Sequence, residues 1–82
     1  MLKDEKIPIA EIYVPAKRRT TLNPETVERL AAEILEDGQK SAILVRHDGT
    51  RYVLVEGLHR LEACRALGEE TILGTLVQAR KF

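Results

Sequence analysis

The residues best suited to chemistry lie at 57–60, where Gly57, His59 and Arg60 follow a valine-rich run and begin a helical pattern. A helix N-terminus presents unpaired backbone N–H groups and the positive end of its dipole, so it favours an anion. Glycine lets an anion approach the backbone, and arginine can hold two phosphate oxygens through its planar fork. The pattern predicts a phosphate site, although solvated residues at a strand end would give the same short motif.

A second basic segment, Lys17-Arg18-Arg19, is compatible with either a phosphate contact or a solvated turn. The 82 residues carry 13 Lys+Arg and 13 Asp+Glu, so the net charge is zero. An overall field of this kind supplies no general attraction for nucleic acid or membrane surfaces. Any anion site must therefore be local.

The remaining reactive residue types indicate structural roles. Cys64 lies among apolar residues and has no cysteine to pair with, which indicates a packed thiol in a reducing compartment. One cysteine and two histidines make no metal-ligand cluster. Because the N-terminus has no long apolar run, we expect a cytoplasmic protein without a membrane span.

The elements that must position these residues follow from local patterns. Asn23-Pro24 is a typical helix start and Gly38 a typical stop, and Asp48-Gly49 is a strong hairpin turn. We expect a strand at 7–14, a loop at 16–22, a helix to Gly38, a hairpin at 42–56, a helix at 58–67 and a strand at 72–78. This order predicts a single α+β domain over residues 1–82, with two main helices covering a small mixed β-sheet.

The first helix should be amphipathic, because its apolar residues recur at helical spacing. They are Val27, Leu30, Ala31, Ile34 and Leu35. Its acidic residues Glu25, Glu28, Glu33 and Glu36 lie at other positions and are expected to face solvent.

Taken together, order, spacing and motifs resemble the ParB/sulfiredoxin superfamily over nearly the whole chain. The resemblance runs from PAKRR through NPETVERLAAEILEDGQ to EGLHRLEACRALG, which resembles the family's Gly-x-His-Arg or Gly-x-Arg-Arg element followed by a helix. It implies a ParB/sulfiredoxin-like fold that binds a nucleoside triphosphate: CTP in ParB-type members, ATP in sulfiredoxins, and a phosphoryl donor in the free serine kinases.

The resemblance also implies which residues touch the nucleotide. The phosphates would lie on Gly57, His59 and Arg60, with further contacts from the basic loop at Arg18 and Arg19 and from Glu25 or Arg29. Gln39 and Lys40 stand where ParB-like domains have a glutamine-containing turn near the nucleotide.

Two positions depart from the subfamily patterns. Sulfiredoxins have a cysteine immediately before the His-Arg pair, and Leu58 stands there, so we expect no sulfinic acid repair. The kinases have an aspartate before the glycine, and Glu56 keeps that carboxylate on a longer stem. Glu56 and Glu25 are therefore the candidates for holding Mg²⁺ or for acid–base work, and catalytic residues stay unassigned.

We expect a stand-alone ParB-like domain that binds CTP or ATP as an accessory or switch factor in DNA-related processes such as partitioning. Two alternatives stay open: a small ATP-dependent phosphotransferase or nucleotide hydrolase, and a protein-interaction module without a ligand. Because no recognition helix is visible, sequence-specific DNA binding should be weak or absent and should require a DNA-binding partner protein. Homodimer formation is left open.

Overall fold

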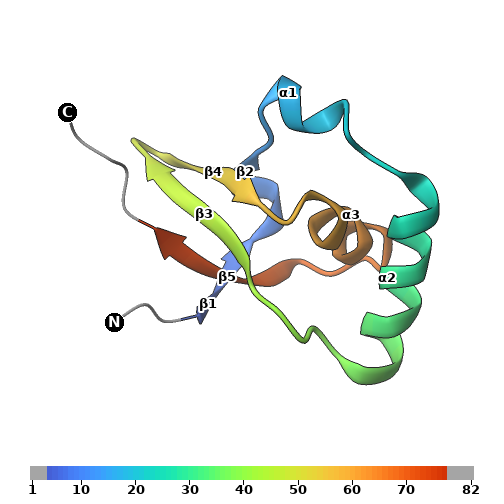
Figure 1. Ribbon diagram of the computed structural model, residues 1–82. Coiled ribbons are helices and arrows are strands. Elements are labelled where there is room, and N and C mark those ends of the chain that lie inside the picture. Colours follow the sequence, from blue (N-terminus) through green and yellow to red (C-terminus); the bar gives the residue numbers. More distant parts are fainter. Residues whose placement is uncertain (1–3, 78–82) are drawn as a thin grey trace.

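A five-stranded mixed β-sheet forms one side of the domain in the computed structural model, which describes residues 4–77 (Figure 1). The strands lie in the order β1-β5-β3-β4-β2. β1 pairs antiparallel with β5 and β3 with β4, whereas β2–β4 and β3–β5 are parallel. Their bounds are β1 Asp4–Pro8, β2 Ile12–Tyr13, β3 Ile43–Asp48, β4 Arg51–Glu56 and β5 Thr71–Val77. The predicted α+β class with a mixed sheet is confirmed.

The single first strand predicted at 7–14 is wrong. The chain instead forms β1, a 3₁₀ turn η1 at Ile9–Glu11, and β2, and these two strands lie at opposite edges of the sheet. Pro8 has no N–H to continue the ladder, which explains why β1 ends there. The following amide, that of Ile9, bonds instead to the carbonyl oxygen of Glu70 at 3.0 Å.

The two main helices match their predicted positions closely. α2 spans Pro24–Asp37 and α3 spans Leu58–Ala66. The Asn23 side chain accepts hydrogen bonds from the next two free amides of α2, and Gly38 ends the helix at a φ of 81°.

The predicted loop at 16–22 is wrong in part, because α1 occupies Ala16–Arg19. At the start of this short helix, the carbonyl oxygen of Pro15 accepts a hydrogen bond from the amide of Arg18 at 2.9 Å.

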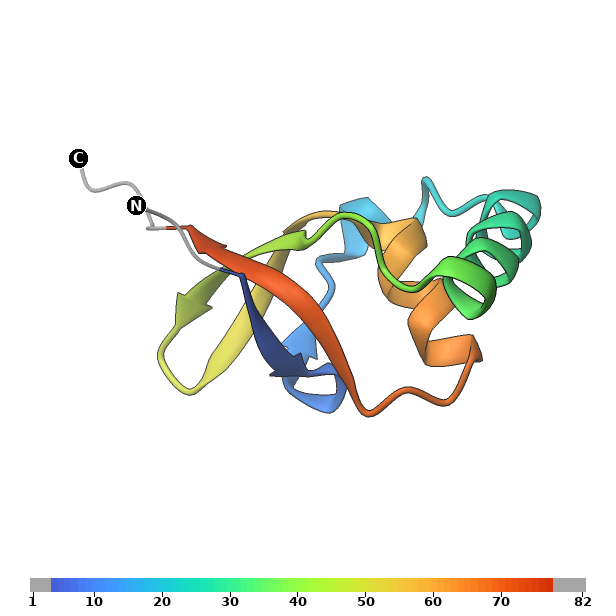
Figure 2. The same cartoon turned by 90° about the horizontal axis from the view of Figure 1, so that it is seen from below.

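The hydrophobic core lies between α3 and the sheet, and α2 covers the outer side of α3 (Figure 2). α3 has four buried residues, Leu58, Leu61, Ala63 and Cys64, of which all but Ala63 belong to this core, so the prediction of a packed thiol is confirmed.

No residue of α2 is buried, and Leu35, predicted on its apolar face, is 77% exposed. That part of the prediction is wrong. A helix that packs mainly on one other helix covers only a narrow stripe, and Leu35 lies outside that stripe.

The hairpin of β3 and β4 forms as predicted, with Gly49 at its tip at a φ of 65°. Val53 and Leu54 point to opposite faces of the sheet, and both are buried. Both faces of the sheet are therefore covered in the middle of β4. The last strand, β5, also forms, and residue 78 of the prediction lies outside the described part. Within residues 4–77, no helix is long and apolar enough to span a membrane.

Candidate functional site

The start of α3 has the geometry of an anion site. Gly57 joins β4 to α3 in the left-handed conformation, at a φ of 111° and a ψ of 30°. The first helical bond runs from the amide of Leu61 to the carbonyl oxygen of Gly57 at 2.9 Å. The amides of residues 58–60 have no acceptor within the helix, and no side chain of residues 4–77 caps them. Three N–H groups and the positive end of the dipole are thus left for a ligand.

Gly57 also has a packing reason to be glycine. A Cβ atom at this position would lie 2.6 Å from Cγ2 of Ile43 and 3.2 Å from its Cα. β3 therefore runs directly against the β4–α3 turn. The close approach observed at Gly57 is that of a strand of the protein itself, and the approach of an anion to this glycine stays a prediction.

His59 connects the starts of the two main helices. Its Nε2 accepts a hydrogen bond from the backbone amide of Asn23 at 2.9 Å, and Asn23 in turn caps α2. A ring nitrogen that accepts is unprotonated, so in the neutral ring the proton is on Nδ1. The Nδ1–H group is the donor that His59 can offer to a ligand.

Arg60 contains a buried hydrogen-bond donor without an acceptor among the described residues. Its Nε atom is buried and has no hydrogen-bond partner in the described part of the chain, although the residue as a whole is only half-buried. A buried N–H without an acceptor costs free energy, and the cost is larger for a charged group. An anionic oxygen held beside the guanidinium would remove that cost.

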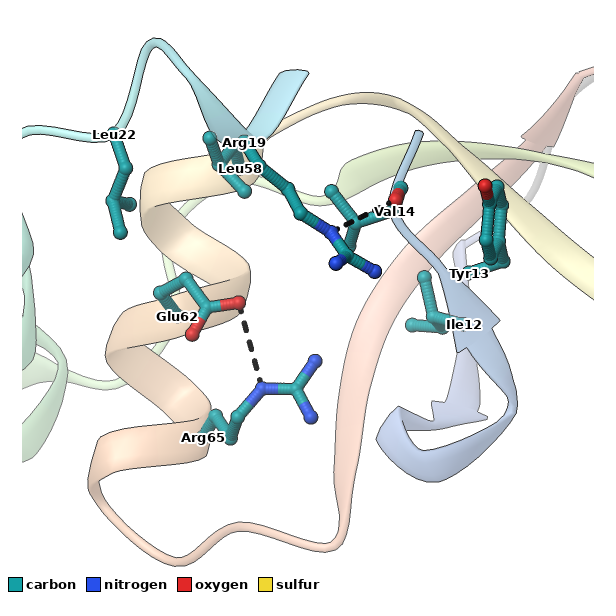
Figure 3. Close-up of a pocket in the computed structure, with 8 residues that line it drawn as sticks. All are labelled: Ile12, Tyr13, Val14, Arg19, Leu22, Leu58, Glu62 and Arg65. Atoms are coloured by element: carbon teal, nitrogen blue, oxygen red, sulfur yellow. Dashed lines mark hydrogen bonds and ion pairs between the residues drawn. The ribbon is translucent and has the colours of Figure 1, made fainter. Parts of the chain in front are cut away.

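Arg19 lies in a cavity of about 470 Å³ beside α3 (Figure 3). Its Nε donates to the carbonyl oxygen of Val14 at 3.2 Å. The cavity extends along α3 from Leu58, the first residue of the helix, and its lining is Ile12, Tyr13, Val14, Arg19, Leu22, Leu58, Glu62 and Arg65. Arg18, also predicted to contact phosphate, is exposed and does not line this cavity.

Sequence reasoning missed Glu62 and Arg65, which form an ion pair at 3.5 Å on the cavity wall. The signal was present in the spacing. Positions 58, 62 and 65 follow the i, i+4, i+7 pattern and so share one face of α3.

Gln39 acts as a substitute for a strand residue. Its Nε2 donates to the carbonyl oxygens of Ser41 and Leu73, both at 2.9 Å, and its Oε1 accepts the amide of Leu73 at 2.8 Å. The side-chain amide thus pairs with β5 just before the ladder with β3 begins at Ile43 and Gly74.

Gln39 lines a second cavity of about 180 Å³ with Cys64 and Glu69, and neither it nor Lys40 lines the cavity that contains Arg19. Lys40 is exposed and pairs with Asp37 at 3.7 Å. Nucleotide contacts by Gln39 and Lys40 stay predictions.

Glu56 and Glu25 are both exposed. Glu56 ends β4 immediately before Gly57, and Glu25 is the second residue of α2. Among residues 4–77, no three His, Cys, Asp or Glu side chains gather closely enough to hold a metal ion. Magnesium binding through either carboxylate stays a prediction.

Comparison with known proteins gives a consistent family. The model of the ParB N-terminal domain matches residues 2–81. No curated protein matches the sequence closely enough to count as a relative.

Among solved structures, sulfiredoxin from Arabidopsis thaliana superposes with a TM-score of 0.85 at 26% identity, covering 94% of this chain and 86% of that one. The chromosome-partitioning protein ParB from Caulobacter crescentus complexed with CTP-gamma-S gives 0.77 at 26% identity, covering 98% and 46%. The same ParB complexed to the centromeric parS site gives 0.76 at 25% identity, covering 94% and 40%. The chain therefore spans less than half of these two ParB structures. The matched model and these neighbours confirm the predicted ParB/sulfiredoxin superfamily, and the chain belongs to the ParB N-terminal domain family.

Proposed function

We propose that this domain binds a nucleoside triphosphate, CTP or ATP, with the phosphates at the start of α3. The observation that carries the proposal is the buried Nε of Arg60, which has no partner among the described residues and belongs to the first turn of an uncapped helix. A charged donor of this kind is satisfied by an anionic oxygen.

Several groups at this site would contact the triphosphate. The amides of residues 58–60 would donate to phosphate oxygens, the Nδ1–H of His59 would add a donor, and Arg60 would supply positive charge. Arg19 would approach from α1 across the neighbouring cavity. Magnesium, when bound, would neutralise phosphate charge, and the carboxylates nearest in sequence to the two helix starts are Glu56 and Glu25.

The relative complexed with CTP-gamma-S supports nucleotide binding, and the family supports a role in partitioning. We infer that nucleotide binding makes the domain a switch or accessory factor in a DNA-related process. α2 presents Glu28, Glu33 and Glu36 to solvent, and these carboxylates would repel a DNA backbone. A separate DNA-binding protein would therefore provide sequence-specific contacts.

Calorimetric titration with CTP and ATP, with and without magnesium, tests the proposal. Arg60→Ala should weaken binding by about 1.5–3 kcal/mol, the usual value for a hydrogen bond to a charged group. Lys6→Ala is the matched control, because it removes one positive charge from exposed edge strand β1. It should leave the affinity within about twofold, since exposed distant charges are screened.

Equal affinities of the wild type and Arg60→Ala would contradict the phosphate assignment. If neither nucleotide binds, the interaction-module alternative replaces the proposal. Release of labelled phosphate from either nucleotide would add the hydrolase alternative to the binding function.

A further inference from the structure

Asn23 is the junction between the two main helices. Its Oδ1 atom accepts the amides of Glu25 at 2.9 Å and Thr26 at 3.3 Å, and its carbonyl oxygen accepts the amide of Val27 at 3.1 Å. These hydrogen bonds form the first turn of α2. The backbone amide of Asn23 itself donates to Nε2 of His59 at 2.9 Å. The first turn of α2 is thus connected to α3 through one imidazole ring.

The imidazole of His59 has one nitrogen available to each helix. His59 is the second residue of α3, so its side chain leaves the same turn that carries the unpaired amides of residues 58–60 and the buried Nε of Arg60. Because Nε2 accepts from Asn23, Nδ1 carries the proton of the neutral ring and can donate to an anion. The same ring can therefore accept from α2 and donate to a ligand at one time.

Hydrogen bonds at the two nitrogens of one imidazole strengthen each other. An anion that accepts from the N–H group increases the electron density of the ring and makes the other nitrogen a better acceptor, as a carboxylate does for a metal-binding histidine. Hydrogen bonds linked in a chain gain about 10–30% each in this way. A phosphate oxygen bound to Nδ1–H of His59 should therefore strengthen the hydrogen bond that Asn23 donates to Nε2.

We propose that His59 couples the anion site to α2, so that an anion bound at the start of α3 holds the first turn of α2 more firmly. The proposal rests on the proposed function, and it names a regulatory consequence of that same site. α2 packs mainly on α3, and the contact of Ile34 with the core lies near the other end of the helix. The effect of the anion should therefore be largest at the first turn, next to Asn23.

Two substitutions separate the roles of the two ring nitrogens. In His59→Gln the side-chain oxygen can take the place of Nε2 and accept from Asn23, while the ring and its Nδ1–H donor are lost. In His59→Asn the side-chain amide lies where Nδ1 was, so a donor to the anion remains and the acceptor for Asn23 is lost. Glutamine thus keeps the connection to α2 without the coupling, and asparagine removes the connection.

Exchange of backbone amides with water, measured by NMR on the full chain at about pH 8, where histidine is ordinarily neutral, tests the inference. Saturating inorganic tripolyphosphate should slow exchange of the Asn23 amide in the wild type by about two- to fivefold, the scale expected for strengthening one hydrogen bond. The amide of Gly38, bonded to Ile34 at the other end of α2, should not respond.

The variants should respond differently. At saturating tripolyphosphate, His59→Gln should show the same Asn23 exchange rate as without the anion. In His59→Asn this amide should exchange about fivefold faster than in the wild type even without the anion, and tripolyphosphate should not restore the wild-type rate. His47→Gln is the matched control, because His47 is the other histidine of the chain and contacts the ring of Tyr52 at 5.1 Å between centroids. It should keep the wild-type response.

Calorimetry on the same samples distinguishes the two proposals. If tripolyphosphate binds while the Asn23 exchange rate of the wild type stays constant or rises, this inference is overturned and the proposed function survives. The same conclusion holds if His59→Gln responds as the wild type does. If tripolyphosphate, CTP and ATP all fail to bind, both proposals are overturned.

Discussion

Replacing Gly57 by alanine should destabilise the domain more than any other replacement of glycine by alanine at a left-handed position. Gly57 has a φ of 111°, and its missing side chain leaves room for β3. Alanine would introduce two costs at once, one from the backbone conformation and one from the contact with Ile43.

The two costs can be separated with numbers. A left-handed conformation costs a non-glycine residue about 1–2 kcal/mol. The new Cβ would lie 2.6 Å from Cγ2 and 2.9 Å from Cβ of Ile43, which is 1% exposed and has little room to move. Overpacking of a core commonly costs about 1–3 kcal/mol. We expect a total of roughly 2–5 kcal/mol, a large part of the ~5–15 kcal/mol by which a typical domain is stable.

Gly68→Ala is the matched control. Gly68 has a φ of 79°, and a Cβ there would meet nothing within 4 Å, so only the conformational cost applies. Urea unfolding followed by circular dichroism should give Gly57→Ala a free energy of unfolding about 1–3 kcal/mol below that of Gly68→Ala. Equal values for the two variants would refute the packing explanation of Gly57 and leave only its backbone conformation.

Three further predictions concern the rest of the molecule. Gln39→Ala should lower the free energy of unfolding by about 1–3 kcal/mol, because two part-buried hydrogen bonds to Leu73 are lost. Lys40→Ala should change it by less than ~0.5 kcal/mol. Urea unfolding of both variants checks this prediction, and equal losses of stability in the two variants would contradict it. Burial, assisted by Glu69, raises the pKa of the Cys64 thiol, so the unfolded chain ionises first and stability should fall as the pH rises above the usual thiol range of about 8.5. In Cys64→Ala this loss of stability at high pH should be absent. A wild-type urea midpoint that stays constant between about pH 7 and 9.5 would contradict the prediction. Fluorescence anisotropy near physiological salt should show no preference among DNA duplexes, and a preference of about a hundredfold for one of them would show autonomous specific binding.

The helices and the hairpin could be predicted because their signals are local. Asn23 and Gly38 mark the two ends of α2 within a few residues of the atoms they satisfy, and Gly49 marks the hairpin tip in the same way. β1 and β2 could not be told apart, because what separates them is which distant strand each one meets. Ile7 pairs with Ile72, and Ile12 pairs with Tyr52. A uniform β-branched run carries no information about those partners.

The candidate site could likewise be predicted only in part. The start of α3 follows from a strand, a glycine and a helix that are adjacent in the chain. The cavity that contains Glu62 and Arg65 exists only because α1 and β2 come to lie beside α3, and no local pattern specifies that approach. The short helix α1 was itself missed, so the place where Arg19 meets this wall was missed with it.

Several residues of the predicted nucleotide site also hold the fold, and this decides how the site should be probed. His59 fixes the start of α2 through the amide of Asn23, and Gln39, just past its end, fixes the chain to β5 through Leu73. These hydrogen bonds add to the apolar packing that holds α2 against α3, in which Ile34 contacts the core. Loss of nucleotide binding on replacing His59 or Gln39 would therefore not distinguish a lost ligand contact from a displaced helix. Arg60 is the sharper probe, because its buried Nε has no partner among residues 4–77 to lose. Its removal should leave the free energy of unfolding unchanged or higher, while the affinity for the nucleotide falls.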